Sequence, residues 1–216
     1  MKSSELYSSV IRYFETEMPV AETELAFESP YQLLVAVILS AQCTDKRVNI
    51  LTPPFFEQFP DAHSLASADQ NQVFELIKSC SYPNNKAKNL LGMARTLLNE
   101  FNGEVPADID LLQKLPGVGR KTANVVASVV FNMPAMAVDT HVYRVAGRLG
   151  LTKGAKNPLQ TEKQLVANIP INKLAIAHHW LILHGRYVCK ARKPLCSDCG
   201  LKDVCKFYKT KSKASS

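Results

Sequence analysis

The four cysteines nearest the C-terminus are the residues of this 216-residue chain most clearly spaced for chemistry. Cys189, Cys196, Cys199 and Cys205 follow the pattern C-x6-C-x2-C-x5-C. Four thiolates in one short loop suit either a [4Fe–4S] cluster or a structural zinc ion. Zinc knuckles usually supply two C-x2-C pairs, and only Cys196 and Cys199 have that spacing here. Four unrelated buried thiols are the third alternative, which such close spacing disfavours.

A second candidate site is the turn at residues 115–121, Leu-Pro-Gly-Val-Gly-Arg-Lys. Gly117, Val118 and Gly119 separate two helical patterns and place backbone N–H groups at the start of the second helix. Such N–H groups, together with the helix dipole, bind phosphate. The alternative is a plain helical connection in which Lys121 is a solvated surface residue. The apolar stripe of the second helix places Lys121 on its opposite, polar face, with Asn124 and Ser128.

Asp139 begins another helical pattern, Val-Asp-Thr-His, and stands where an N-cap residue belongs. Capping alone would explain it. A carboxylate fixed by helix N–H groups also suits an electrostatic or proton-accepting role, so the two roles are compatible. The periodicity places His141, Arg144 and Arg148 on the outer face of this helix. That face is either solvated or directed at a polyanion.

The elements that must position these residues are all helical. Helices are predicted over 3–17, Tyr31–Ala41, 45–59, 69–79, 84–101, 108–115, 120–131, 140–149, 159–168 and 171–186. No set of period-2 runs predicts a sheet. Tyr31–Ala41 is apolar on most sides, which predicts a buried core helix. The tail Lys209–Ser216 is basic and small, which predicts disorder.

Composition limits the class of protein. Hydrophobic residues make up 46% of the chain, enough for a real core, and the net charge of +7 favours a polyanionic partner. No secretory signal opens the sequence, and the longest apolar run, Leu33–Leu39, is too short to span a bilayer. We therefore expect a cytoplasmic protein, where disulfides are uncommon. Cys43 and Cys80, isolated in the sequence, are expected to be buried free thiols.

The turn, the Val-Asp-Thr-His segment and the cysteine loop, in this order, resemble the endonuclease III family of DNA glycosylases. The resemblance covers residues 5–208 and rests on LPGVGRKTA, VDTHVYRV and the four-cysteine pattern. It implies an all-α fold of two packed helical domains. The first is a helical barrel with a helix-hairpin-helix at 21–133. The second is formed by 1–20 and 134–216 and carries a [4Fe–4S] cluster.

By the same resemblance Lys121 is the nucleophile and Asp139 its partner. Members of the family remove oxidised pyrimidines from duplex DNA and then cleave the strand at the abasic site. An amine can attack the sugar C1′, expel the base and leave a Schiff base that eliminates the 3′ phosphate. Asp139 can accept a proton from the amine and stabilise positive charge on the sugar.

The resemblance also implies contacts with double-stranded DNA. The residues expected to make them are Gln42, Tyr82, Gly117, Val118, Gly119, Thr140, His141, Lys190, Arg192 and Lys193. Gln42 would fill the space left by a flipped base, and Tyr82 would insert into the base stack. The loop at Tyr82 departs from the family pattern, because Ser81 replaces a glycine and Pro83 is added.

Three other functions are weighed against this one. Adenine-DNA glycosylases share the fold but lack the lysine of the hairpin, which is present here, and carry an extra domain. A non-catalytic DNA-binding or redox-sensing relative would lack Lys121 or Asp139. A zinc-stabilised helical adaptor would need zinc at the cysteines. The expected protein is a monomeric enzyme that binds DNA and no membrane.

Overall fold

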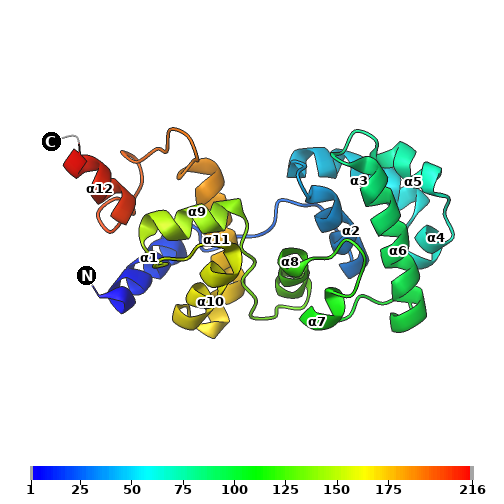
Figure 1. The fold of residues 1–216 in the computed structure, drawn as a ribbon, viewed down its shortest axis with the longest axis horizontal. Helices are drawn as coiled ribbons and strands as arrows, with labels where there is room; N and C mark the ends of the chain where they lie inside the picture. Colours follow the sequence, from blue (N-terminus) through cyan, green and yellow to red (C-terminus); the bar gives the residue numbers. More distant parts are fainter. Residues whose placement is uncertain (1, 215–216) are drawn as a thin grey trace. The chain divides into compact units, whose positions relative to one another are not determined.

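The computed structural model describes residues 2–214, and every regular element in that range is helical. The expected all-α fold class is confirmed. No helix in the described range is long and apolar enough to cross a membrane. Contacts divide the chain into an inner unit, Thr23–Asn132, and a terminal unit, Met1–Glu22 with Met133–Ser216 (Figure 1). The boundaries expected from the sequence lie within two residues of these, and the assignment of functional domains stays a prediction.

The inner unit is built around one buried helix. Its helices are α2 (Pro30–Ser40), α3 (Asp45–Gln58), α4 (Ala62–Ala66), α5 (Gln70–Ile77), α6 (Pro83–Phe101), α7 (Ile109–Leu112) and α8 (Arg120–Val130). Between Tyr31 and Leu39 only Gln32 is not buried, so the expected core helix is confirmed. This α2 packs against α3, α6 and α8. The Ser29 side chain accepts a hydrogen bond from the Gln32 N–H at 3.2 Å and caps the helix.

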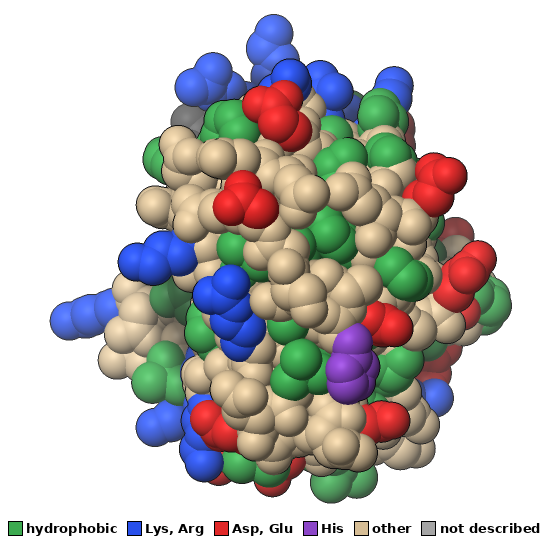
Figure 2. Space-filling model, turned by 90° about the vertical axis from the view of Figure 1, so that its right-hand side faces the viewer, with side chains coloured by type: hydrophobic (Ala, Val, Ile, Leu, Met, Phe, Trp, Pro, Cys, Tyr) green, Lys and Arg blue, Asp and Glu red, His purple; other side chains and the backbone are tan. Residues whose placement is uncertain are grey.

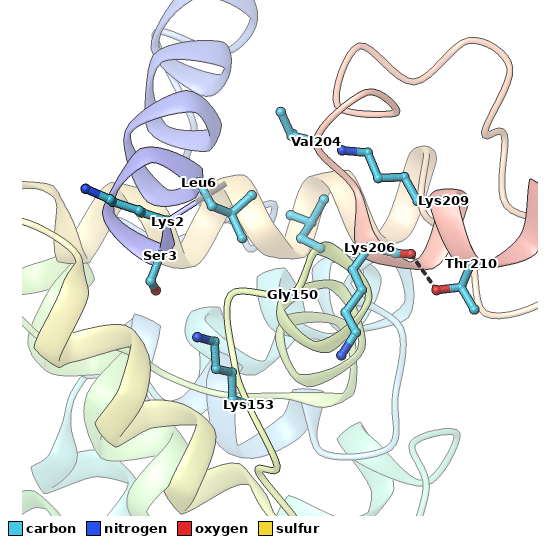
Figure 3. A pocket seen from close by; sticks show the side chains of 10 residues that line it. Lys2, Ser3, Leu6, Gly150, Lys153, Val204, Lys206, Lys209 and Thr210 are labelled. Atoms are coloured by element: carbon cyan, nitrogen blue, oxygen red, sulfur yellow. Dashed lines mark hydrogen bonds between the residues drawn. The ribbon is translucent and has the colours of Figure 1, made fainter. Parts of the chain in front are cut away.

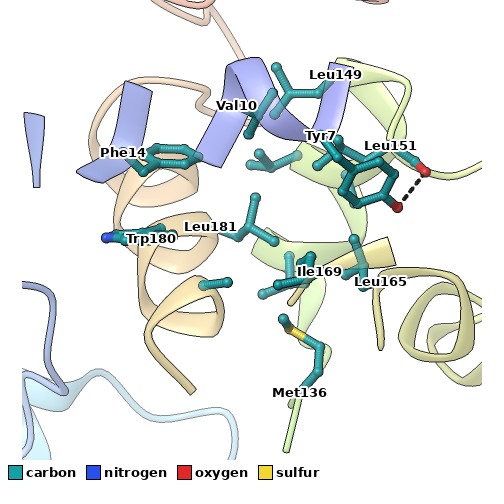
Figure 4. Close-up of a cluster of buried hydrophobic side chains, with 14 of the residues drawn as sticks. Tyr7, Val10, Phe14, Met136, Leu149, Leu151, Leu165, Ile169, Trp180 and Leu181 are labelled. Carbon is teal, nitrogen blue, oxygen red and sulfur yellow. Dashed lines mark hydrogen bonds between the residues drawn. The ribbon is translucent and has the colours of Figure 1, made fainter. Parts of the chain in front are cut away.

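The terminal unit joins the two ends of the chain in one core. Its helices are α1 (Ser3–Glu17), α9 (Thr140–Leu149), α10 (Pro158–Asn168), the 3-10 helix η1 (Ile171–Lys173), α11 (Leu174–Tyr187) and α12 (Lys206–Ala214). The Phe14 ring stacks on Trp180 with centroids 5.8 Å apart (Figure 4). The Tyr7 hydroxyl donates to the Leu151 carbonyl at 2.8 Å. These contacts bury one face of α1 against residues more than a hundred positions later.

The net positive charge belongs to the terminal unit. The inner unit has nine Lys and Arg against eleven Asp and Glu, whereas the terminal unit has 17 against 8. Figure 2 looks onto the side that carries α4–α6 in Figure 1, and there acidic, basic and hydrophobic side chains are interspersed. A polyanion would therefore be attracted mainly by the terminal unit.

Two features of the fold differ from the sequence-based expectation. The short helix α4 is not predicted by periodicity. The prediction of disorder at Lys209–Ser216 is wrong for residues 209–214, because these residues continue α12. The last two residues of the predicted segment lie outside the described range. No glycine or proline interrupts this segment, and the hydroxyls of Thr210 and Ser212 donate to the carbonyls of Lys206 and Tyr208 at 3.0 and 3.1 Å. Packing of α12 on α9 provides the tertiary support that an isolated helix of this length would lack.

Candidate functional site

The turn before α8 depends on a glycine with an unusual backbone conformation. Gly117 has φ +81°, and a Cβ atom there would lie 2.9 Å from the Asn89 Cβ. Only glycine fits both constraints. The Val118 N–H donates to the Leu115 carbonyl at 3.0 Å and the Val118 side chain is buried. This N–H is therefore used within the turn, which argues against its expected role in binding phosphate.

Gly119 differs from Gly117, because nothing in its own chain requires a glycine. Its φ is −87°, which any residue adopts, and a Cβ atom would meet nothing within 4 Å. Gly119 caps α8 and has no side chain that would cover the start of the helix. The open space there and the positive end of the helix dipole suit the close approach of a phosphate backbone.

Lys121 lies in the first turn of α8 and is exposed. Asn124 and Ser128 share its face by periodicity, but both are buried, at 3% and 5% exposed. The expected polar face of α8 is therefore exposed only at its beginning. The helix thus presents Lys121, directly after the two glycines, at its accessible end.

Asp139 caps α9 in the terminal unit. Its Oδ1 accepts a hydrogen bond from the Val142 N–H at 2.8 Å, and the side chain is half-buried. A carboxylate has two oxygens, and the cap uses one of them. Capping and a chemical role are thus compatible. Of the next two residues, Thr140 is exposed and His141 half-buried.

The two arginines of α9 do not lie on a solvated outer face, which corrects the sequence-based interpretation. Arg144 donates to the carbonyls of Cys189 at 3.1 Å and Gly185 at 2.9 Å. Arg148 donates to the carbonyl of Lys190 at 2.7 Å. Both side chains are half-buried because α9 packs against α11 and the start of the cysteine loop. Their role in this structure is to fix that loop.

The four cysteines surround one cavity. Its remaining walls are mainly apolar and include Leu149, Val188, Pro194, Leu195 and Phe207. Burial raises the pKa of the Cys199 and Cys205 thiols, and the neighbouring cysteines raise it further. Within residues 2–214, no three Cys, His, Asp or Glu side chains are grouped to hold a single metal ion. Four soft ligands spread around an apolar cavity fit an iron–sulfur cluster better than one zinc ion.

His184 provides a second observation at this cavity. It is 2% exposed, its Nε2 lies 3.7 Å from Cys199 Sγ, and its Nδ1 is buried without a hydrogen-bond partner. Burial lowers the pKa of His184 to about 4, so the ring is neutral at pH 7. A neutral imidazole beside the thiols adds no charge to the cavity. The donor set and its surroundings therefore fit the expected cofactor.

The first part of the cysteine loop exposes three basic side chains. Lys190, Arg192 and Lys193 are all exposed. The loop backbone below them is fixed, because Arg148 donates to the carbonyls of Lys190 and Ala191 at 2.7 and 3.0 Å. The structure thus brings these three predicted residues together on one ordered segment.

The inner unit brings Gln42 and Tyr82 onto neighbouring loops. Both side chains are exposed, and the Ser81 hydroxyl donates to the Gln42 carbonyl at 2.6 Å. Cys43 and Cys80, isolated in the sequence, are neighbours here. Burial raises the pKa of the Cys43 thiol, and a hydrogen bond with Cys80 raises it further. Both are free thiols, but only Cys80 is fully buried.

A separate cavity of about 360 Å³ lies beside Gly150, the C-terminal cap of α9 (Figure 3). Asp139 caps the other end of that helix. The cavity is lined by Lys2, Ser3, Leu6, Leu149, Gly150, Lys153, Val204, Lys206, Lys209 and Thr210. The ten residues of α9 separate it from the end capped by Asp139 by about 15 Å. It is therefore not part of the candidate site.

Comparison with known proteins decides between the alternatives. The model of the HhH-GPD superfamily base excision DNA repair protein matches residues 35–170, and that of the iron-sulfur binding domain of endonuclease III matches residues 189–205. Endonuclease III of Rickettsia felis is 45% identical over 205 residues, which cover 95% of this chain and 96% of the relative. The chain belongs to the endonuclease III family.

Other members of the endonuclease III family are similar over most of their length. Endonuclease III of Escherichia coli (strain K12) is 46% identical over 189 residues, 88% of this chain and 89% of the relative. The structure of a trapped endonuclease III–DNA covalent intermediate is 42% identical with a TM-score of 0.93, and the match covers 98% of this chain and 100% of that one. A thermostable thymine-DNA glycosylase, 23% identical with a TM-score of 0.85, shares the fold.

Membership in the endonuclease III family confirms the resemblance inferred from the motifs. The protein is an enzyme of base excision repair, a DNA glycosylase and AP lyase by family. Its cysteine loop is the iron–sulfur binding domain of this family, and a [4Fe–4S] cluster is the cofactor expected there.

Sequence reasoning missed Lys86 and gave Arg144 and Arg148 the wrong role, although all three organise the site. A signal existed for Lys86, because it occupies a core position of α6 in register with Leu90 and Leu97. No comparable local signal marks the arginines, whose partners lie about 40 residues away.

Proposed function

We propose that the protein removes oxidised pyrimidines from duplex DNA and cleaves the strand 3′ to the abasic site by β-elimination. The observation that carries this proposal is the exposed Lys121 in the first turn of α8, directly after the open glycine Gly119. An amine beside a phosphate-binding helix start can reach a sugar next to the phosphate. The solved covalent intermediate of endonuclease III with DNA supports a covalent mechanism.

The chemistry requires one nucleophile. Nζ of Lys121 forms a bond to C1′ as the bond between C1′ and the base breaks, and the base leaves with a proton. Opening of the sugar ring, with a proton taken up by O4′, gives a protonated Schiff base. Loss of a C2′ proton then breaks the C3′–O bond, and the 3′ phosphate departs. Asp139 is the carboxylate that accepts the proton of the attacking amine and stabilises positive charge on the sugar.

DNA would contact both units of the chain. In the inner unit, Gly117, Gly119 and the first turn of α8 approach the phosphates, while Tyr82 inserts into the stack and Gln42 fills the space of the flipped base. In the terminal unit, Thr140, His141 and the exposed side chains of the cysteine loop face the duplex. The excess positive charge of the terminal unit supports this assignment.

The cysteine loop has a structural part in this proposal. Cys189, Cys196, Cys199 and Cys205 would hold the cluster, which supplies crosslinks within the loop rather than electrons for base removal. The loop in turn directs Lys190, Arg192 and Lys193 toward DNA phosphates. Base removal and β-elimination need no change of oxidation state.

Covalent trapping tests the nucleophile and the lesion class together. Borohydride reduces a Schiff base to a stable amine, and the substrate is a duplex with one thymine glycol. We expect wild type to be trapped and Lys121→Gln to lose trapping and nicking while it still binds DNA. Lys114→Gln is the matched control, because Lys114 is an exposed lysine of the same hairpin. Trapping of Lys121→Gln would show that another amine is the nucleophile.

A second substrate separates the two parts of the proposal. If wild type is trapped on a preformed abasic site but not on thymine glycol, the lyase step stands and the oxidised-pyrimidine substrate is refuted.

The proposal also includes a monomeric protein in the bacterial cytosol, on the nucleoid. Light scattering of the purified protein with and without duplex DNA tests the monomeric state.

A further inference from the structure

Lys86 is a buried lysine of the inner unit that the proposed chemistry does not use. It lies in the first turn of α6 and is 5% exposed. Its neighbours along the buried stripe of that helix are Leu90, Met93 and Leu97. Burying an ammonium group without partners is costly, so a lysine at such a position needs an acceptor for each of its three N–H groups.

The acceptors are two helix-end carbonyls and a thiol. Nζ donates to the carbonyl oxygens of Leu39 and Ala41, both at 2.7 Å, and to Cys80 Sγ at 3.1 Å. Leu39 lies in the last turn of α2 and Ala41 caps it. The last carbonyls of a helix lack partners within the helix and carry partial negative charge, so a cation is favoured there. Lys86 therefore crosslinks the end of α2 to the first turn of α6, and its bond to Cys80 includes the segment just before that helix.

This crosslink joins two loops with unusual backbone conformations. Gln42, just after α2, and Tyr82, just before α6, both have φ 54°. Neither is a residue that commonly adopts the left-handed region. The hydrogen bond from the Ser81 hydroxyl to the Gln42 carbonyl is a second tie between the loops. Such conformations persist only where the surrounding structure enforces them.

We propose that Lys86 is a positioning residue for damage recognition, because it sets the spacing between the loops that carry Gln42 and Tyr82. This inference rests on the proposed function, in which both side chains enter the DNA. Tyr82 is 62% exposed, so its ring is available for stacking, whereas the Lys86 ammonium is buried and acts through the backbone of the loops. A small displacement of an inserting side chain is enough to lose much of the rate.

The two activities of the enzyme should depend on Lys86 to different extents. Removing a base requires the damaged nucleotide to leave the stack, and in the proposed function Tyr82 and Gln42 offset this cost. A preformed abasic site has no base to expel. We therefore expect loss of Lys86 to slow base removal much more than strand cleavage at an abasic site.

The main variant is Lys86→Met, which keeps the length of the side chain and removes its donors. Single-turnover base removal from thymine glycol should fall about ten-fold, and cleavage at a preformed abasic site less than about three-fold. Lys88→Met is the matched control, since Lys88 is an exposed lysine two residues later in α6. It should leave both rates within about two-fold of wild type.

A double-mutant cycle tests whether Lys86 acts through Tyr82. When Lys86→Met is added to Tyr82→Ala, the double variant should remove the base less than about two-fold more slowly than Tyr82→Ala alone, because the inserting ring is already absent. Full additivity of the two losses would overturn the inference. Equal loss of both activities in Lys86→Met would also overturn it, because a general structural defect has that effect.

A binding measurement separates this inference from the proposed function. A duplex with 2-aminopurine opposite a tetrahydrofuran site cannot undergo base removal, and its fluorescence rises when the opposite base is unstacked. Wild type should raise the fluorescence and Lys86→Met should raise it less at saturation, whether or not thymine glycol is a substrate. An unchanged rise would overturn the inference. If Lys86→Met does not fold, Ser81→Ala is tested instead. This variant should also raise the fluorescence less than wild type does, and an unchanged rise would again overturn the inference.

Discussion

The Nη1 atom of Arg148 donates a hydrogen bond to the carbonyl oxygen of Lys190 at 2.7 Å. The same guanidinium donates to the Ala191 carbonyl at 3.0 Å and lies 4.6 Å from the centre of the Phe207 ring. One side chain of α9 thus fixes the backbone of the loop whose lysines remain exposed. The geometry of the cysteine loop depends on α9 as well as on its own ligands.

We predict that Arg148→Lys destabilises the cysteine loop although it keeps the charge. A lysine cannot reproduce the fixed pair of N–H donors of the planar guanidinium, and each hydrogen bond lost contributes about 0.5–1.5 kcal/mol. The visible absorbance of the cluster should decay faster on dilution into chelator, and the melting temperature should fall. Arg12→Lys, at an exposed position of α1, is the control and should change neither. Equal decay rates for both variants would contradict this role of Arg148.

Asp139→Asn should reduce single-turnover base removal by at least about a hundred-fold with little change in melting temperature. Asparagine can still cap α9 but carries no charge. The control is Asn157→Ala, because Asn157 caps α10 by accepting from the Gln160 N–H at 2.9 Å. That variant should lose about 1 kcal/mol of stability with normal turnover. Normal turnover in Asp139→Asn would show that the only role of Asp139 is to cap α9.

Neutralising Lys190, Arg192 or Lys193 should weaken the binding of damaged and undamaged duplex alike. Each lost phosphate contact should reduce the slope of log K against log salt by about 0.9. Base removal at saturating enzyme should stay near the wild-type rate. Lys163→Gln, an exposed lysine of α10, is the control for charge alone. A loss of saturated rate with normal binding would show that the loop acts on the chemistry.

The stability of the protein should fall between pH 6.5 and pH 4, and His179 should account for part of this loss alongside His184, whose pKa burial also lowers to about 4. Burial and, to a smaller extent, the charge of Arg186 together lower the pKa of His179 to about 4. The unfolded chain binds a proton near pH 6.5, so it is favoured as the pH falls below that value. Between pH 7 and pH 5, His179 should account for a loss of about 2 kcal/mol in the free energy of unfolding.

Urea unfolding at pH 7 and pH 5 measures this effect. The difference between the two pH values should shrink by about 2 kcal/mol in His179→Gln and stay the same in His63→Gln, at an exposed position of the inner unit. Visible absorbance, followed in parallel, reports any loss of the cluster. If His179→Gln leaves the difference in unfolding free energy between pH 7 and pH 5 unchanged, His179 does not cause the loss of stability.

Much of this protein could be predicted from local patterns. Apolar periodicity predicted most helices to within a few residues, because each helix must bury one stripe whatever it packs against. Lys121 and Asp139 stood out because turn glycines and an N-cap position are visible in a few consecutive residues. The four cysteines were recognisable because a short loop can supply all the ligands of a metal site, so their spacing is visible in the sequence.

Only the tertiary structure decided what the helix surfaces contact. The sequence placed Arg144 and Arg148 on an outer face of α9, and packing against α11 and the cysteine loop half-buries both. Lys86 similarly takes two of its three acceptors from the end of a helix more than forty residues earlier. Such partners are separated by long stretches of chain, and they meet only when the helices pack. Periodicity identifies a buried or exposed stripe, but the hydrogen bonds that fix a loop depend on that packing.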